Sequence, residues 1–312
     1  MRIGVDIMGG DFAPLNTVKG ALLARDILSK DVELVLFGPA DVIKNQFNEL
    51  NASYEGFEIV DAPEVIEMGD HPAKAFQQKP KSTIAVGLSM LKNGLLDGFA
   101  SGGNTGAVLV GVMYIIKSIP GLIRPCIAVY IPRIDGSKAI LADVGINPDC
   151  RPDVLYQYAI LASKYAELVY GMNNPQVGLL NIGSEPDKGN LLVKATFDLM
   201  KDSPHFNFIG NLEGTDLLTP GKGDVIICDG FVGNVVLKQS EAFYEILKQR
   251  NIQDEYFEKF DFENYGGIPI LGVNKTVIIG HGASTPKAVM NMIVHTHLVA
   301  QSNLIQKLIE TF

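Results

Sequence analysis

The residues best suited to chemistry form the stretch Ser101-Gly102-Gly103-Asn104-Thr105-Gly106-Ala107, between the apolar runs 95–100 and 108–116. Glycines lack a Cβ, so the backbone here can turn sharply and approach a ligand closely. Ser, Asn and Thr add hydroxyl and amide groups, and we expect Thr105 to cap the following helix. A strand end, a glycine turn and a helix N-terminus together favour an anion, because unpaired N–H groups point outward there. The stretch matches neither G-x-G-x-x-G nor the P-loop, so it indicates no particular nucleotide.

Similar glycine-bearing turns with Asp, Asn, Lys or His follow other strand-like runs. They are Asp6 to Asp11, Asp143 to Asn147, Asn181 to Asn190, Asp229 to Asn234 and Gly280 to Ser284. In an open α/β sheet, ligands bind beyond the carboxyl ends of the strands, so we expect these turns to line one crevice. Any one such turn is more often a plain connection than a site. The prediction therefore depends on the recurrence.

Single residues in these turns carry different expectations. Lys188 lies in a glycine-flanked loop at a predicted helix start, where a cation is disfavoured unless an anion is present. Asn234 is both a candidate N-cap and a candidate ligand donor. His281 is either an acid/base group or a hydrogen-bonded structural histidine. Asp6 and Asp143, inside apolar strands, are equally well explained as buried structural carboxylates or as ligands.

Composition restricts the function classes. The chain has 312 residues, 47% of them hydrophobic, and a formal net charge of −9, which argues against nucleic acid as a partner. No apolar run is long enough to span a bilayer, and the three cysteines lack metal-site spacing, so we expect a cytoplasmic chain with reduced thiols. Neither H-E-x-x-H nor G-x-S-x-G occurs. We therefore predict no metal and no cofactor.

Strand-length apolar runs alternate with helix-period segments, which predicts parallel βαβ construction. The expected strands are 3–7, 33–37, 57–60, 98–100, 177–181, 206–210, 225–228 and 277–279, and the expected helices are 15–28, 41–47, 83–92, 105–116, 153–170, 191–200, 235–248 and 286–309. The runs 126–131 and 139–144 form an expected hairpin through Asp135-Gly136, so the sheet should be mixed. We predict one α/β domain over 1–312, with a subdomain around the 126–144 hairpin as the alternative.

Taken in order, these motifs resemble the bacterial acyl-ACP:phosphate acyltransferase (PlsX) family over nearly the whole chain. The motifs that carry the resemblance are Asp6-Ile7-Met8-Gly9-Gly10-Asp11, the Ser101 to Ala107 loop, Asp143-Val144-Gly145 with Asn147 and Cys150, Gly178 to Gly183 with Lys188-Gly189-Asn190, Asp229 to Lys238, Tyr265-Gly266-Gly267 and His281-Gly282-Ala283-Ser284. Each motif alone is only moderately specific for the family, whereas the motifs together, in the same order, are strongly specific for it.

The resemblance implies attack of inorganic phosphate on the thioester of a fatty acyl-acyl carrier protein, giving acyl phosphate for phospholipid synthesis. It also implies a three-layer α/β/α sandwich like that of isocitrate and isopropylmalate dehydrogenases, and a homodimer. We assign Lys188 and Asn234 as catalytic residues, bearing phosphate and transition-state charge. The assigned phosphate-binding residues are Gly10, Asp11, Ser101, Gly103, Asn104, Thr105, Asp143, Asn147, Asp229 and His281.

Alternatives remain within and beyond enzymes. A phosphate acetyl- or butyryltransferase using acyl-CoA shares the expected fold and nucleophile; a decarboxylating dehydrogenase and a non-catalytic binder of acyl thioesters or phosphate are weaker. The stretch 241–265 departs most from the family, because its segment 249–260 is short and acidic. Aromatic residues there could reach an interface, but acidic charge is repelled by anionic lipid, so contact with the inner membrane face is in doubt. Candidate carrier-docking cations are Lys79, Lys81, Arg124 and Arg133.

Overall fold

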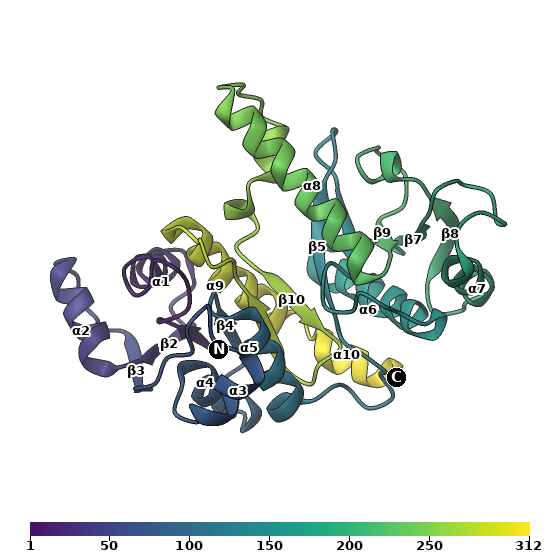
Figure 1. Ribbon diagram of the computed structural model, residues 1–312. Coiled ribbons are helices and arrows are strands. Elements are labelled where there is room, and N and C mark those ends of the chain that lie inside the picture. Colours follow the sequence, from purple (N-terminus) through teal and green to yellow (C-terminus); the bar gives the residue numbers. More distant parts are fainter. The chain divides into compact units, whose positions relative to one another are not determined.

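The computed structural model describes residues 1–312, apart from the side chain of Phe262, and the chain forms two compact units (Figure 1). Unit 1 comprises Met1–Lys117, Phe262–Pro269 and Val273–Gln301, and unit 2 comprises Ser118–Asp261, Ile270–Gly272 and Ser302–Phe312. The predicted hairpin lies inside unit 2. The single-domain prediction and its subdomain alternative stay predictions.

Unit 1 contains a mostly parallel sheet in the order β3-β2-β1-β4-β11. The first half of β10 pairs with β11 in the antiparallel direction and extends this sheet. Its strands are β1 Arg2–Asp6, β2 Glu33–Gly38, β3 Phe57–Asp61, β4 Gly98–Ser101, β11 Thr276–Ile279 and the first half of β10 Ile268–Leu271. Its helices are α1 Leu15–Ile27, α2 Ala40–Glu49, α3 Pro72–Gln78, α4 Thr83–Lys92, α5 Thr105–Gly111, the π-helix η1 Val112–Ile116, the 3₁₀ turn η4 Phe262–Asn264 and α9 Pro286–Gln301.

Helices cover both faces of the unit 1 sheet. A Cβ on Gly98 would meet the side chain of Thr296 in α9, whereas the ring of Phe99 packs directly on Gly87 in α4. Consecutive strand residues face opposite sides of a sheet, so α9 and α4 lie on opposite faces. The strands between them are buried at successive positions, as in β1 from Ile3 to Asp6 and β2 from Leu34 to Gly38.

Unit 2 contains a mixed sheet in the order β5-β6-β9-β7-β8, and the end of β10 pairs antiparallel with β5. The strands are β5 Cys126–Pro132, β6 Lys138–Ala142, β7 Gln176–Leu180, β8 Asn207–Leu212 and β9 Val225–Ile227. The helices are α6 Pro152–Tyr170, α7 Leu191–Met200, the 3₁₀ turn η2 Gly214–Leu217, α8 Gly230–Gln249, the 3₁₀ turn η3 Phe257–Phe260 and α10 Leu304–Thr311. The antiparallel β5–β6 pair confirms the predicted hairpin and the mixed sheet.

One core cluster of unit 2 joins the hairpin to α8 and η3. Val129, Leu141 and Ile226 form its sheet side, and Phe260 is buried among them. Tyr256 packs against the same cluster, and its hydroxyl donates to the Pro132 carbonyl at 3.1 Å. Of the three aromatic residues in the segment 249–260, Tyr256 and Phe260 therefore pack within unit 2.

Several element boundaries differ from expectation. The missed strand β10 contains Pro269, and proline lowers the strand signal of a run because it lacks an N–H donor. The helix expected over 286–309 is two helices, separated at Asn303, which takes a left-handed φ of 58°. Helix α8 begins at Gly230, five positions before the predicted start at Val235, because Asp229 caps it. The short helix α3 was also missed.

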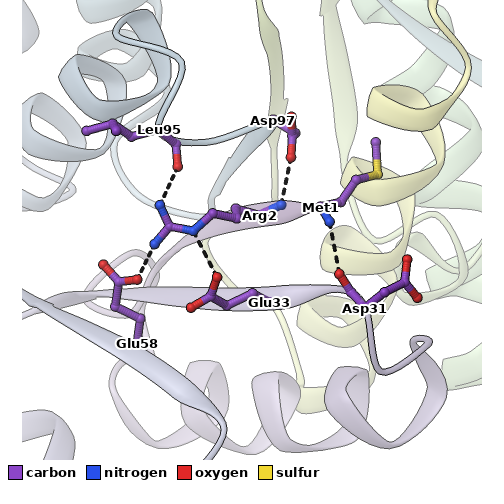
Figure 2. A network of polar contacts seen from close by, with 7 residues as sticks. All are labelled: Met1, Arg2, Asp31, Glu33, Glu58, Leu95 and Asp97. Atoms are coloured by element: carbon purple, nitrogen blue, oxygen red, sulfur yellow. Dashed lines mark hydrogen bonds and ion pairs between the residues drawn. The ribbon is translucent and has the colours of Figure 1, made fainter.

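A polar network ties the N-terminal ends of the unit 1 strands (Figure 2). The Arg2 guanidinium donates to Glu33 at 2.9 Å, to Glu58 and to the Leu95 carbonyl at 2.7 Å, while the Arg2 backbone N–H donates to Asp97 at 2.7 Å. One side chain thus links β1 to β2, to β3 and to the turn before β4. Its hydrogen bonds to both glutamates hold the pKa of Arg2 above its usual value, although partial burial opposes them.

We expect Arg2→Ala to lower the free energy of unfolding by about 1–2 kcal/mol, because a charge-assisted cluster is lost but stays partly solvated. Urea denaturation is the measurement. Arg151→Ala, which removes a single exposed pair with Asp153, is the control and should change stability by less than about 0.5 kcal/mol. Equal losses in the two variants would show that the network adds nothing beyond a surface pair.

Candidate functional site

The loops after β1, β4 and β11 meet in unit 1. The Asp11 N–H donates to the Gly282 carbonyl at 2.8 Å, and the Gly280 N–H donates to the Ser101 carbonyl at 2.8 Å. Gly10 has a φ of 123°, and a Cβ there would lie 3.0 Å from the Gly282 carbonyl oxygen. Only glycine readily combines that conformation with so close an approach. The structure therefore brings Gly10, Asp11, Ser101 and His281's loop together.

A buried carboxylate holds two of these loops. Asp6 is 1% exposed, and it accepts hydrogen bonds from the Ser101 hydroxyl at 2.7 Å and the Met8 N–H at 3.2 Å. The Ser101 hydroxyl oxygen in turn accepts from the Gly103 N–H at 3.1 Å. Burial raises the pKa of Asp6, while the hydrogen bonds from Ser101 and its neighbours act in the opposite direction. Asp6 and Ser101 thus have structural partners.

Asn104, and not Thr105, caps helix α5, so the predicted cap at Thr105 is wrong. Asn104 Oδ1 accepts from the Ala107 N–H at 2.9 Å, because the chain enters the helix one residue earlier than expected. Its Nδ2 donates to the carbonyls of Glu67, Met68 and Asp70 at 3.0–3.1 Å. The oxygen and the nitrogen of the Asn104 side chain therefore both bond within the protein, whereas Thr105 is exposed.

His281 and Asp11 are the exposed polar residues of the other two loops. His281 Nδ1 accepts from the Ala283 N–H at 3.2 Å, and the His281 carbonyl accepts from the Ser284 hydroxyl at 2.5 Å. The histidine therefore orders its own turn, and its ring edge reaches solvent.

A second buried carboxylate occupies the end of β6 in unit 2. Asp143 is fully buried; its Oδ1 accepts from the N–H groups of Ile127 and Ile146 at 3.1 and 3.4 Å, and its Oδ2 accepts from the Asn147 N–H at 2.7 Å. Burial raises the pKa of Asp143, opposed by these backbone hydrogen bonds. The carboxylate thereby fixes the turn after β6 to the start of β5.

Asn147 extends this arrangement to α8. Its Nδ2 donates to the Pro125 carbonyl at 2.8 Å, and its carbonyl accepts from the Gly230 N–H at 2.8 Å. A Cβ at Gly233 would overlap the Asp143 carbonyl oxygen, so the helix approaches the turn closely. Asp143 and Asn147 are thus brought together as predicted residues, but their polar groups bond to the protein.

Asp229 and Asn234 both lie at the start of α8. Asp229 Oδ1 accepts from the Val232 N–H at 2.9 Å and is the N-cap, so the cap predicted at Asn234 is wrong. Asn234 lies in the helix, exposed, with its Nδ2 donating to the Val144 carbonyl at 3.2 Å. Its amide reaches back over the turn that Asp143 fixes.

Lys188 lies in the loop between β7 and α7. Its side chain is 47% exposed, and its Nζ is 3.9 Å from Glu185 Oε1. The Lys188 carbonyl accepts from Asn181 Nδ2 at 3.2 Å, and Gly189 follows with a φ of 92°. An exposed pair at this distance contributes little, so the backbone of the loop is held while the ammonium can reorient.

A cavity of about 540 Å³ lies in unit 2 where α7 and α8 begin. Its lining residues are Pro148, Asp149, Cys150, Asn190, Leu192, Asp229, Phe231 and Val232. Of the predicted site residues, Asp229 alone lines it. Burial raises the pKa of Cys150 to about 11, so its thiol stays protonated at neutral pH. Asn190 caps α7, accepting from the Val193 N–H at 2.9 Å.

The sequence held a partial signal for this cavity. Asp229 is a predicted phosphate-binding residue and Asn190 belongs to a predicted motif, but the apolar residues beside them are not among the predicted site residues. Leu191 is 87% exposed and Phe231 is 65% exposed. Large apolar side chains at such exposure are unusual enough to mark a contact surface when they cluster. Exposure itself was not readable from one sequence.

The candidate docking cations separate into two kinds. Arg133 is buried, and its guanidinium donates to the carbonyls of Lys222 and Gly223, so a docking role for Arg133 is wrong. Lys79 donates to the Val65 carbonyl and to Asp70 within unit 1. Arg124 is exposed, and its guanidinium donates to the Asp149 carbonyl at 3.2 Å.

Within the part of the chain that the structure describes, no group of three or more His, Cys, Asp or Glu side chains is arranged to hold a metal ion. Nor does any helix there combine the length and apolar character needed to cross a bilayer.

Comparison with known proteins decides the family. The model of the family described as "Fatty acid synthesis protein" matches residues 1–256 and 245–307. The chain belongs to this family. The two matched segments overlap at 245–256, inside the 241–265 stretch where the sequence departs most from the expected pattern.

Several relatives of this chain are named phosphate acyltransferase. A "Phosphate acyltransferase" of Dictyoglomus turgidum is 39% identical over 333 residues, covering 99% of this chain and 97% of that one. Another of Salinibacter ruber is 41% identical over 331 residues, covering 100% and 97%. A solved phosphotransacetylase from Streptococcus pyogenes superposes with a TM-score of 0.69 at 18% identity, covering 96% and 94% of the two chains. That likeness concerns the fold, and it agrees with the α/β class predicted for this family member.

We expect Asp6→Ala to lower the free energy of unfolding by about 2–4 kcal/mol, because the Ser101 hydroxyl and the Met8 N–H lose a buried acceptor. Urea denaturation is the measurement.

Asp6→Asn tests how the stability of the wild type depends on pH. Because burial raises the pKa of Asp6 in the folded chain, its ionisation lowers stability at neutral pH, and this penalty is relieved as the pH falls through the folded-state pKa. Asn does not titrate. The stability advantage of wild type over Asp6→Asn should therefore widen on acidification, measured by urea unfolding; a constant difference would contradict this.

Proposed function

We propose that this chain transfers a fatty acyl group from an acyl carrier protein to inorganic phosphate. The observation that carries the proposal is the name "Phosphate acyltransferase" borne by relatives about 40% identical over nearly its whole length. The acyl carrier protein and phosphate are the partners that this reaction requires. Acyl-CoA is the alternative donor, and the weak identity to phosphotransacetylases supports only the shared fold.

The reaction makes moderate demands on the protein. A phosphate oxygen forms a bond to the thioester carbonyl carbon, the C–S bond breaks, and the carrier leaves as a thiolate that takes a proton. Phosphate is already an anionic nucleophile, so positioning and stabilisation of negative charge are the main contributions required. Asp6 and Asp143 are buried behind hydrogen-bonded turns and are not available as bases.

Lys188 is the proposed bearer of charge. It is the cation of a glycine-flanked loop after β7, and its pair with Glu185 is long and exposed. An ammonium in that state is readily redirected toward a phosphate or a developing oxyanion. Asn234, exposed at the start of α8, is proposed to donate an amide N–H to the same charge.

The phosphate-binding assignment stays a proposal in each unit. In unit 1 it involves the backbone of Gly10 and Gly103 together with the exposed Asp11, Thr105 and His281. The buried side chains of Ser101 and Asn104 in unit 1, and of Asp143 and Asn147 in unit 2, support this role by holding loops. Asp229 in unit 2 caps α8 with one carboxylate oxygen, so its proposed part in this role is to hold the start of that helix.

A homodimer belongs to the same proposal. Among the described residues of α8, only Gly230 and Gly233 are buried in the isolated chain. Phe243 and Ile246 are about half exposed, and a second copy of the chain would cover such apolar area. Location in the cytoplasm, with contact to the inner membrane face as an added option, remains an expectation from the resemblance.

Hydroxylamine trapping of acyl phosphate tests the function. Protein, phosphate and palmitoyl-acyl carrier protein should give acyl hydroxamate, whereas omission of phosphate should give none. Product from acetyl-CoA but none from the carrier protein would favour the acyl-CoA alternative. No turnover with any thioester would leave a binder.

Lys188→Ala should lower the rate of acyl phosphate formation by roughly 100- to 1,000-fold, as removal of an oxyanion-stabilising group does. Lys201→Ala is a matched control, since Lys201 is also about half exposed and pairs with an acidic residue three positions before it, Asp198. The control should retain activity within about twofold. A Lys188→Ala rate within a few-fold of wild type would refute the assignment.

A further inference from the structure

The cavity at the starts of α7 and α8 has a lining unsuited to phosphate. Two of its lining residues, Asp149 and Asp229, carry carboxylates, and its lining residues include no lysine or arginine. Asp229 uses one oxygen to cap α8, and its second oxygen remains an acceptor. Like charges that approach closely in a partly enclosed space repel, so an anionic ligand is disfavoured here. Groups that donate N–H or O–H bonds are favoured.

The remaining lining is neutral. Cys150 carries a protonated thiol, and Asn190 can donate from its amide nitrogen while its oxygen caps α7. Leu192 and Phe231 supply apolar surface. The combination of acceptors, one amide donor and apolar patches suits a neutral chain that carries amides and short alkyl groups. A plain hydrocarbon chain would instead remove water from two carboxylates without replacing their hydrogen bonds.

A cation lies beside the cavity without lining it. The Arg124 guanidinium donates to the carbonyl of Asp149, one of the lining residues, at 3.2 Å. Arg124 is exposed, so its remaining N–H donors can meet an anionic group in solvent. The lining of the cavity is therefore rich in hydrogen-bond acceptors, and one cationic side chain, Arg124, lies beside it.

We propose that this cavity binds the pantetheine arm of the acyl carrier, with its amide N–H groups against Asp149 and Asp229 and its phosphate group at Arg124. The proposal rests on the proposed function, because it takes the donor substrate to be an acyl thioester. It adds where unit 2 holds the linker of that substrate, at a cavity whose lining residues do not include Lys188. About 540 Å³ lies within the usual range of small-molecule sites.

The absence of tryptophan from the sequence gives a clean reporter. Phe231→Trp places one indole in the cavity lining, and Val235→Trp places one a helical turn further along α8. Each variant is titrated with pantetheine and, separately, with 4′-phosphopantetheine while indole fluorescence is recorded. In at least one of the two reporter variants, the indole fluorescence should change to a plateau with each ligand. The phosphorylated ligand should have the lower Kd.

Arg124→Ala, made in the reporter that responds, should raise the Kd of 4′-phosphopantetheine by about three- to tenfold, the loss of one exposed charge-assisted contact. The Kd of pantetheine should be unchanged. Arg250→Ala, which removes an exposed arginine at the far end of α8, is the control and should alter neither value.

Three outcomes overturn the proposal: no saturable signal with either ligand in either reporter, equal loss of affinity for both ligands in Arg124→Ala, or equal effects of Arg124→Ala and Arg250→Ala. Turnover of palmitoyl-acyl carrier protein by wild type is measured in parallel. Turnover without reporter binding refutes this site alone, whereas binding without turnover refutes the proposed function and leaves a pantetheine-binding cavity.

Discussion

The polar loops of both units depend on a carboxylate buried at the end of a strand. Removing an ionised carboxylate from water costs several kcal/mol unless hydrogen bonds replace its hydration. Donors in the neighbouring turns, chiefly backbone N–H groups, offset part of that cost at Asp6 and Asp143, although burial still raises the pKa of both carboxyl groups. Because those donors must converge on one group, the turns are fixed relative to their strands. Asn234, which lies in α8 and donates to the Val144 carbonyl of the Asp143 turn, is positioned against a turn that this constraint fixes.

Much of the architecture could be read from local pattern. Strands covered on both faces are apolar at successive positions, so β2 and β9 were recognisable without any partner. The hairpin of β5 and β6 was equally visible, because Asp135-Gly136 between two apolar runs is a strong turn signal, and Gly136 takes a φ of 86°. These features depend on residues close in sequence.

The site was harder to predict because its hydrogen bonds join distant residues. Asn104 donates to carbonyls more than 30 residues away, and Arg133 donates to carbonyls more than 80 residues away. Nothing near either residue shows that its polar atoms are already used. Sequence alone therefore predicted that polar groups gather after the strands, but not which of them face the protein. The caps Asn104 and Asp229 were missed for the related reason that Thr105, the next residue, and Asn234, five positions further on, are also good hydrogen-bonding types.

The contact between Gly233 and the carbonyl of Asp143 has a consequence for how this family can change over time. The turn after β6 presents backbone atoms to its neighbours, so the side chains at Ile146 and Pro148 do not take part in those bonds. Substitutions there leave the bonded atoms in place, whereas any side chain at Gly233 would push the helix away from the turn. Divergence should therefore be permissive at Ile146 and restricted at Gly233, a small helical residue whose backbone packs against the turn.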